Sequence, residues 1–403
     1  MKKRMGKTRG MSCLELLARV ILTLVGLCLL VVAALIILVL VGRNKTVVLP
    51  APSGPYAVGR VSFDWVDDSR VETFAQNQDA KRELMVWLWY PAEPVPGAAP
   101  AEYLPANWLQ ARQQDQGIGS LLLQRFNAIR VHAVTDAPVS LAEAGYPVLI
   151  LSPGYGQLPT DYTTLAEDLA SHGYIVAGIA NTYSAPVVVF PDGRVVRRVP
   201  EASIPETSAE AGRQAADKLV MVWAADVVSV MNQLEKLNAD TGGKFTGCLD
   251  LNRLGVFGHS FGGAASAQAC LVDDRCKAGI DMDGTLFGAV VQKGVKQPFM
   301  FITSEPISPE LDELDMRSFV SSLENGAIWI MIEGSRHFNF TDFAVIFAPP
   351  LKVLMLGSID GRRGLKITSD YTRLFFEQYL SQVDALLLQG PSPDYPEVQF
   401  RSP

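Results

Sequence analysis

The chain has 403 residues, of which 48% are hydrophobic and 19% are charged, so it can bury a large core without being divided into several domains. Its formal charge of −7 is unevenly distributed, because residues 1–45 carry eight Lys or Arg and one Glu, which leaves −14 on the remainder. An acidic body disfavours nucleic acid as a partner. The composition therefore indicates one large globular domain behind a basic N-terminal segment.

An uncharged apolar run of 22 residues occupies positions 20–41, and as a helix of about 33 Å it is long enough to cross a bilayer core. Six Lys or Arg precede it and only Arg43 and Lys45 follow closely, so the positive-inside rule keeps residues 1–19 in the cytoplasm. A cleaved signal peptide usually has an apolar core of about 7 to 15 residues that ends in small residues. We therefore predict an uncleaved transmembrane anchor and an extracytoplasmic body, with a secreted protein as the alternative.

The segment 42–56 is rich in proline and small residues and is expected to form a short, semi-extended tether that sets the distance of the body from the bilayer. The body, residues 57–403, is expected to be one domain. An early strand is predicted at 84–90, stopped by Pro91.

From residue 146 onward, strand and helix signals alternate, which is the pattern of an α/β protein with a mostly parallel sheet and helices on both faces. Catalytic groups gather at the C-terminal ends of the strands of such a sheet. The expected strands cover 147–151, 174–180, 253–257, 277–282, 299–303 and 327–332, and the expected helices cover 161–171, 208–237, 264–271 and 369–387.

The strand-like run at 253–257 breaks into Gly-His-Ser-Phe-Gly at 258–262. A Gly-x-Ser-x-Gly turn between a buried strand and a helix is a nucleophile elbow, in which the glycines permit a strained backbone that exposes the serine hydroxyl. The bare pattern is common, but the apolar strand before it and the small, helix-favouring residues at 264–271 provide the required context. Ser260 is therefore the candidate nucleophile.

A serine nucleophile needs a neutral imidazole within hydrogen-bond reach and a third group that orients that ring. Behind such an elbow the order is serine, acid, histidine, and His337 is the one histidine of four that lies beyond Ser260. The other three are expected to be structural. On the residues alone the acid stays open between Asp283 and Glu305, which end successive strands, while Asp281 shares a strand face with Asp283 but lies further from the loop.

An ester hydrolase also needs donors for the developing oxyanion, usually the backbone N–H after the nucleophile and another after the third strand. Phe261 and Tyr155 occupy these positions. Tyr155 lies in Ser-Pro-Gly-Tyr-Gly, whose glycines allow the backbone to approach a substrate carbonyl. We therefore expect these two N–H groups to form an oxyanion hole.

Five cysteines are too few for a disulfide scaffold in a chain of this length. Cys270 and Cys276 can pair across the loop between them if the body is exported, although two buried thiols are an equally good interpretation. No cysteine or histidine spacing matches a metal site, so we expect chemistry without a metal or a cofactor.

Six separated blocks follow one another along the body: GPYAVG at 54–59, DLASHGYIVAGI at 168–179, GVFGHSFGGA at 255–264, AGIDMDG at 278–284, FITSE at 301–305 and GSRHFNFTDF at 334–343. Together they resemble the plasma-type platelet-activating factor acetylhydrolases, from about residue 54 to the final helix. The resemblance implies an α/β-hydrolase fold and a calcium-independent serine esterase that releases short or oxidised acyl chains from phospholipids. It also implies the triad Ser260, Asp283 and His337 and the oxyanion donors Tyr155 and Phe261.

Two features depart from that family. Pro153-Gly154 stands where the family commonly has His-Gly, and is similar to the Ser-Pro-Gly-Tyr of bacterial cutinases and polyester hydrolases. Thr-Leu-Phe-Gly follows the AGIDMDG block in place of an aromatic-rich continuation, which implies a different acyl pocket. We therefore expect hydrolysis of a lipid ester through an acyl-enzyme, with a polyester or triglyceride hydrolase, or an inactive binding module of the same fold, as alternatives.

The apolar segment 343–356, FAVIFAPPLKVLML, follows His337 closely. We expect it to pack in the core, with an acyl-binding wall or a lipid contact as the alternative.

Overall fold

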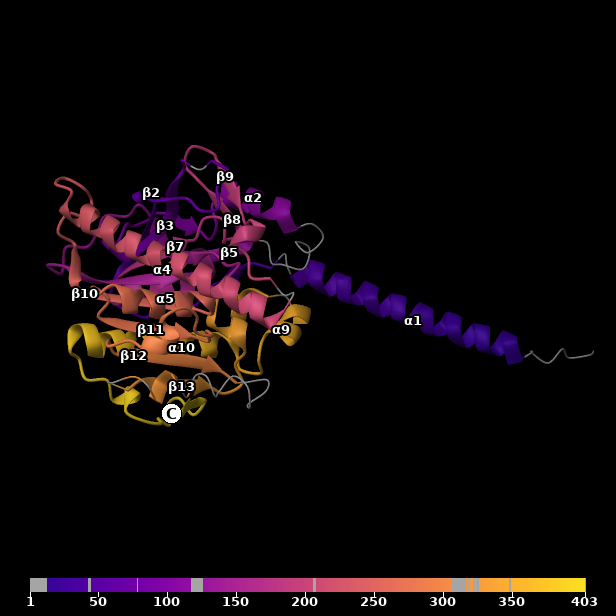
Figure 1. The fold of residues 1–403 in the computed structure, drawn as a ribbon. Helices are drawn as coiled ribbons and strands as arrows, with labels where there is room; N and C mark the ends of the chain where they lie inside the picture. Colours follow the sequence, from indigo (N-terminus) through magenta and orange to yellow (C-terminus); the bar gives the residue numbers. More distant parts are fainter. Residues whose placement is uncertain are drawn as a thin grey trace, which may run out of the picture.

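The computed structural model of the chain describes residues 13–42, 45–77, 79–116, 126–205, 208–305, 317, 319–321, 323, 326–347 and 349–402. A twelve-stranded sheet runs through the body in the order β1-β5-β2-β3-β7-β6-β10-β11-β12-β13-β14, with β4 paired to β5, and β8 and β9 form a separate hairpin (Figure 1). The strands are β1 (Val47–Val48), β2 (Ala57–Val71), β3 (Lys81–Ala92), β4 (Pro100–Glu102), β5 (Ile129–Thr135), β6 (Tyr146–Ser152), β7 (Ile175–Ala180), β8 (Val187–Val189), β9 (Val195–Arg197), β10 (Leu249–His259), β11 (Ala278–Met282), β12 (Phe299–Ser304), β13 (Ile328–Ile332) and β14 (Val398–Phe400).

In sequence order, most helices of the described residues follow β6 and alternate with the later strands. The helices are α1 (Cys13–Gly42), α2 (Ala106–Gln116), α3 (Thr163–Ser171), α4 (Ala209–Ala239), α5 (Phe261–Val272), α6 (Val290–Lys293), α8 (Phe343–Ile346), α9 (Pro349–Met355) and α10 (Gly361–Ser381). Short 3-10 turns are η2 (Phe126–Ala128), η3 (Pro159–Tyr162), η4 (Pro200–Ala202), η5 (His337–Phe340) and η6 (Leu386–Leu388).

The centre of the sheet is parallel. Strands β7, β6, β10, β11, β12 and β13 all run in one direction, and Val256 of β10 pairs with Ile150 of β6 on one side and with Gly279 of β11 on the other. Every residue of β6 is buried, as expected of a strand that is covered on both faces. The predicted α/β fold with a mostly parallel sheet is thus confirmed.

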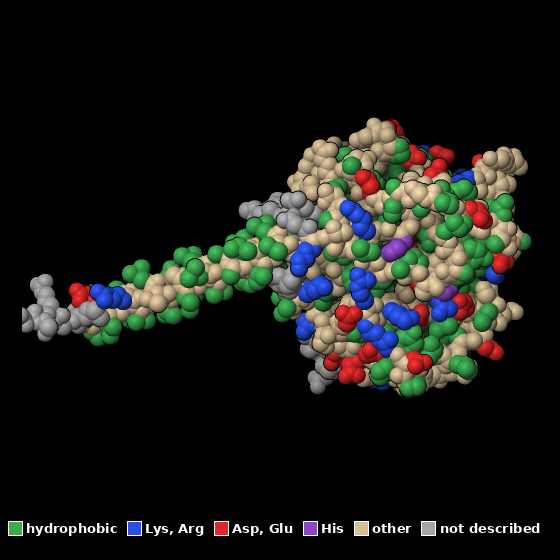
Figure 2. Space-filling view, turned by 180° about the vertical axis from the view of Figure 1, so that it is seen from behind, with side chains coloured by type: hydrophobic (Ala, Val, Ile, Leu, Met, Phe, Trp, Pro, Cys, Tyr) green, Lys and Arg blue, Asp and Glu red, His purple; other side chains and the backbone are tan. Residues whose placement is uncertain are grey.

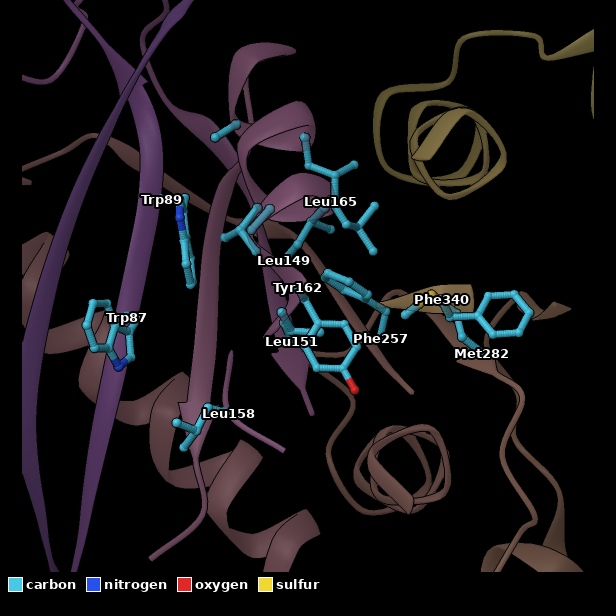
Figure 3. Close-up of a cluster of buried hydrophobic side chains, with 14 of the residues drawn as sticks. Trp87, Trp89, Leu149, Leu151, Leu158, Tyr162, Leu165, Phe257, Met282 and Phe340 are labelled. Atoms are coloured by element: carbon cyan, nitrogen blue, oxygen red, sulfur yellow. The ribbon is translucent and has the colours of Figure 1, made fainter. Parts of the chain in front are cut away.

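Helices cover both faces of this parallel region. Successive residues of a strand point to opposite faces, so Leu149 and Leu151 belong to one hydrophobic cluster and Val148 and Ile150 to the other. Helices α3 and α10 pack on the first face, and α4 and α5 pack on the second, in front of the sheet in Figure 1. Figure 3 shows part of the first cluster, in which Tyr162 lies among the aliphatic side chains.

The last helix is displaced from its expected position at 369–387, since α10 covers Gly361–Ser381. It begins earlier because the Asp360 carboxylate caps it by accepting the Arg363 N–H at 3.0 Å. The sequence did not indicate this start, because Gly361 and Gly364 lie in the first turn and glycine is a poor helix former. It ends at Gln382, which adopts a left-handed conformation with φ of 56°.

The long hairpin of β2 and β3 was only partly predicted. The strand expected at 84–90 lies within β3, but β2 has many polar residues and its burial alternates along its outer half. Pro91 does not stop β3, because it lies within the strand and pairs with Val58. The hairpin joins the parallel region through antiparallel pairing of β3 with β7.

The N-terminal helix α1 contains the predicted span 20–41 and begins within the segment expected to be cytoplasmic, while residues 1–12 lie outside the described part. Its apolar stretch has a mean hydropathy of 3.5 and none of it is buried. Figure 2 shows it as a hydrophobic rod that projects from the body. Within the described residues it is the one helix long and apolar enough to cross a bilayer, a test that signal sequences also pass.

Within the segment expected to be a short, semi-extended tether, 42–56, residues 47–49 and 53–54 pack on the body. Val47 and Val48 form β1 on the edge of the main sheet, and Leu49 is buried. The Ser53 hydroxyl and N–H both donate to Asp168 at 2.8 Å. Backbone pairing with β5 and the burial of Leu49 thus hold this segment against the domain.

Cys270 and Cys276 form a disulfide across the loop that connects α5 to β11. Both residues are buried. This pairing resolves the choice that the sequence left open, and disulfides persist mainly in oxidising compartments.

Replacing both cysteines with serine is expected to lower the free energy of unfolding by about 2 kcal/mol, because a cross-link over a short loop restricts the unfolded chain. Chemical denaturation of the double variant and the parent measures the difference. Reduction of the parent should produce the same loss, whereas equal stabilities of parent and variant would contradict the role of the bond.

Candidate active site

Ser260 lies at the tip of a sharp turn between β10 and α5. Its φ of 54° is in the left-handed region, which is strained for a residue with a side chain, and its N–H donates to the Met282 carbonyl at 2.8 Å. The turn depends on small neighbours, because a Cβ at Gly258 would overlap the Gly262 backbone. Ser260 itself is only partly buried. This is the geometry of the predicted nucleophile elbow.

His337 begins the turn η5 after β13, and its Nδ1 lies 2.7 Å from Oδ2 of Asp283, at the end of β11. The other carboxylate oxygen of Asp283 accepts the Ser304 N–H at 2.7 Å. Burial opposes ionisation of Asp283, but these hydrogen bonds and the nearby imidazole outweigh it and lower the pKa of the carboxyl group. An ionised Asp283 therefore fixes the His337 ring with Nδ1 as the donor.

The other two carboxylates considered for this role lie elsewhere. Glu305 is exposed, and its Oε2 accepts the Gly334 N–H at 2.9 Å, which ties the end of β12 to the turn after β13. Asp281 is fully buried beneath the elbow, and its Oδ1 accepts the Gly284 N–H at 2.8 Å. Burial raises the pKa of Asp281 well above its usual range, whereas the hydrogen bonds of Asp283 lower the pKa of that carboxyl group. Among the three, Asp283 is the one bonded to His337.

His259, which was expected to be structural, forms a hydrogen bond with the backbone of His337. Its Nε2 lies 2.9 Å from the His337 carbonyl, and because a carbonyl only accepts, Nε2 carries the proton. Its Nδ1 lies 2.8 Å from the Tyr162 hydroxyl, which accepts the Gly154 N–H at 2.9 Å. Burial and the neighbouring His337 lower the pKa of His259 to about 3, so the ring is neutral. The one sequence feature that pointed to these contacts is the position of His259 inside the Gly-His-Ser-Phe-Gly turn.

The proposed oxyanion donors lie on neighbouring segments. Phe261 is the first residue of α5, and its ring meets that of Tyr155 edge to face, with centroids 6.4 Å apart. Neither backbone N–H donates a hydrogen bond to a residue that the structure describes. The loop that carries Tyr155 approaches α5 closely, because a Cβ at Gly262 would collide with the Ser152 and Pro153 carbonyl oxygens. Both N–H groups thus lie, without a partner in the described residues, on segments that meet at the start of α5.

The Gly262→Ala substitution is expected to lower kcat for a soluble ester by about 10²-fold, because the new methyl group forces the Tyr155 loop away from the elbow and displacements near 1 Å are that costly. Steady-state kinetics on a nitrophenyl ester measures the change. The matched control is Gly390→Ala, a glycine with open space around it, which should keep the parental rate. A Gly262→Ala enzyme at full activity would show that this contact does not position the loop.

One ring nitrogen each of His259 and His337 and one carboxylate oxygen of Asp283 lie within 4.8 Å of one another, a spacing that suits metal ligands. Each of these side chains is committed to a hydrogen bond, since Asp283 and His337 bind each other and His259 binds the His337 carbonyl. We therefore assign no metal to this grouping.

Burial differs along the apolar segment 343–356. Phe343, Phe347 and Leu356 are buried in a small cluster with Phe338, the neighbour of His337. Val353 and Leu354 of α9 are instead 84% and 68% exposed, and α9 contacts α1. Leu351 and Met355 of α9 pack against the same cluster, so the expected core packing holds for both ends of the segment but not for the exposed residues 352–354.

A serine on a strand-to-helix elbow, beside a hydrogen-bonded His–Asp pair at the C-terminal edge of a parallel sheet, defines the α/β-hydrolase class of serine esterases. A family model described as platelet-activating factor acetylhydrolase, isoform II, matches residues 41–387. The chain belongs to this family, and it is a serine esterase.

Individual relatives agree with this assignment. The chain is 28% identical to a probable 1-alkyl-2-acetylglycerophosphocholine esterase of Arthroderma benhamiae, over 87% of this chain and 93% of that protein. It is 25% identical to the platelet-activating factor acetylhydrolase of Cavia porcellus, over 82% of this chain and 78% of that one. Among solved structures it is similar to a ferulic acid esterase from Streptomyces cinnamoneus, with a TM-score of 0.73, 28% identity, and coverage of 88% and 99% of the two chains.

Proposed function

We propose that this esterase hydrolyses phospholipid esters with short or oxidised acyl chains through an acyl-enzyme on Ser260. The observation that carries the proposal is the 2.7 Å bond between His337 and Asp283 beside the elbow of Ser260. The names of the relatives, 1-alkyl-2-acetylglycerophosphocholine esterase and platelet-activating factor acetylhydrolase, support the substrate class.

In the proposed reaction the Ser260 hydroxyl attacks the ester carbonyl and gives its proton to Nε2 of His337. The carbonyl oxygen becomes an oxyanion that accepts the Tyr155 and Phe261 N–H groups. Collapse of this intermediate breaks the ester bond, His337 protonates the departing alcohol, and the acyl group stays on the serine. Water, deprotonated by His337, then releases the fatty acid and restores the enzyme.

The charges of the site suit this proton transfer. Asp283, with its lowered pKa, is a carboxylate at neutral pH and stabilises the imidazolium that forms on His337. His259, whose ring lies 4.4 Å from that of His337, stays neutral because of its pKa of about 3. A charged His259 would repel the imidazolium, so the neutral state of this second ring removes a repulsion that would oppose the proton transfer.

We also propose that α1 is retained as a membrane anchor with the body outside the cytoplasm. The charge bias of residues 1–45, the disulfide and the exposed Val353 and Leu354 beside α1 support this. N-terminal sequencing of the mature protein and alkaline extraction of membranes provide the test. A membrane-bound protein that keeps residues 13–42 agrees with the proposal, whereas a released protein that begins after residue 42 identifies a cleaved signal and a secreted enzyme.

A second candidate is hydrolysis of polyesters or aromatic esters. Two observations favour it: the Ser-Pro-Gly-Tyr sequence at 152–155 and the likeness to a ferulic acid esterase over nearly all of that protein. Comparing kcat/KM for a short-chain phosphatidylcholine, a feruloyl ester and a polyester film decides between the two. The phospholipid should be preferred by at least tenfold.

Labelling with a fluorophosphonate separates both enzymatic functions from a binding module. The probe reacts only with an activated serine, so mass spectrometry should find the adduct on Ser260. A folded protein that remains unlabelled would support an inactive binding module instead.

A further inference from the structure

Aromatic rings lie together at the start of α5, next to Ser260. Phe261, the neighbour of Ser260, contacts the ring of Tyr155 at 6.4 Å and that of Phe287 at 5.7 Å between centroids. An arginine lies over each of the two outer rings. The guanidinium of Arg198 is 5.4 Å from the Tyr155 ring, and that of Arg213 is 5.0 Å from the Phe287 ring.

The two arginines differ in how their charge is balanced. Arg213 has an acidic partner, since its Nε lies 3.6 Å from Asp217. Arg198 forms no ion pair and no hydrogen bond through its side chain within the described part of the chain, and it is exposed. The charge of Arg198 is thus available in a body that carries many more acidic than basic groups.

The Arg198 guanidinium is held close to the oxyanion loop. A Cβ built on Gly156 would lie 3.4 Å from Nη1 of Arg198, so the guanidinium lies over the segment that contains the Tyr155 N–H. The backbone beside it is fixed, because the Val199 N–H donates to the Tyr183 carbonyl at 3.0 Å. Stacking on the Tyr155 ring limits the rotamers of the long side chain, which reduces the entropy lost when it binds a ligand.

We propose that Arg198 forms an anion subsite that binds a phosphate or carboxylate group of the ester substrate while its carbonyl occupies the oxyanion hole. A guanidinium presents a planar fork of donors that matches the paired oxygens of either group. The inference rests on the proposed esterase function. Two sources supply such an anion: the phosphodiester on the alcohol side of a phospholipid, and the terminal carboxylate of an oxidised acyl chain.

The test uses the full chain in detergent with three esters: neutral nitrophenyl butyrate, dibutyroyl phosphatidylglycerol, and mono-nitrophenyl glutarate, which carries a carboxylate on the acyl side. The Arg198→Ala variant should raise KM for an anionic ester by about 10- to 100-fold with little change in kcat, because a charge-assisted hydrogen bond is lost from binding. Its kinetics on the neutral ester should stay within about twofold of the parent. The control is Arg197→Ala, which removes the same charge from a guanidinium bonded to Gln114.

A selective loss on phosphatidylglycerol identifies the phosphodiester as the ligand, and a selective loss on the glutarate ester identifies the acyl carboxylate. Equal losses on all three esters, or none on either anionic ester, would overturn the proposal. A second measurement does not depend on catalysis. Calorimetry gives the affinity for a short-chain phosphatidylglycerol analogue whose ester-linked chains are replaced by ether-linked chains, so that it cannot be hydrolysed. If the parent cleaves no ester, tighter binding of this analogue by the parent than by Arg198→Ala still supports the subsite, and equal affinities refute it.

Discussion

Replacing Ser260 with alanine is expected to lower kcat for a soluble nitrophenyl ester by about 10⁶-fold, the largest effect of any single change in this chain. The nucleophile disappears, and the oxyanion donors and His337 then have no acyl transfer to assist. Active-site titration with a fluorophosphonate should at the same time fall from one equivalent to none. The residual rate reports the binding site and oxyanion hole alone.

The interpretation of this variant requires an intact fold. Alanine is also strained at a φ of 54°, so the unfolding midpoint of Ser260→Ala should be measured beside its activity. Ser358→Ala, at a serine in the loop before α10, is the control and should retain the parental rate. Ester hydrolysis at full speed by folded Ser260→Ala would end the assignment of this residue as nucleophile.

Asp283→Asn is expected to lower kcat by about 10⁴-fold while leaving KM within a few-fold of the parent. An amide removes the negative charge that stabilises the His337 imidazolium, and its NH₂ group can donate to Nδ1, which moves the ring proton to the nitrogen that must accept from Ser260. The hydrogen bond from Ser304 N–H keeps the side chain in place, so the loss should come from electrostatics rather than from unfolding.

Glu305→Gln is the matched control for that variant, because it makes the same carboxylate-to-amide change one strand further along the sheet. Its hydrogen bond with the Gly334 N–H can be retained by the amide oxygen, so activity should stay within about twofold of the parent. The opposite pattern, with a large loss for Glu305→Gln and none for Asp283→Asn, would transfer the acid to Glu305.

Those parts of the site that depend on local chain geometry were accessible from the sequence. The elbow is a contiguous pattern in which glycine is required at fixed offsets, as the crowding around Gly258 shows. His337 followed from chain order. The acid did not follow from spacing, because Asp283 and Glu305 both end parallel strands, and only the three-dimensional path of the loop after β13 decides which one meets His337.

Features that depend on contacts between distant segments were not accessible. The segment 42–56 was expected to be a semi-extended tether because it is rich in proline, but its backbone pairs with the edge of β5, more than eighty residues away. The support of His337 by His259 and Tyr162 likewise needs three separate segments of the chain to meet: the end of β10, η3 and η5. Secondary-structure propensity and hydrophobic periodicity depend on residues close together in the chain, so they do not predict contacts between distant segments.

The packing of residues 47–54 against the body has a consequence for where the enzyme works. Only a few residues separate the end of α1 at Gly42 from β1, which limits the reach of the chain there to less than about 20 Å. With α1 in a bilayer, as proposed, the catalytic domain cannot reach lipid in other membranes that lie far from its own. It would meet substrate by lateral diffusion in its own leaflet. Its turnover would therefore depend on the surface density of substrate lipid in that leaflet rather than on the bulk concentration in the surrounding fluid.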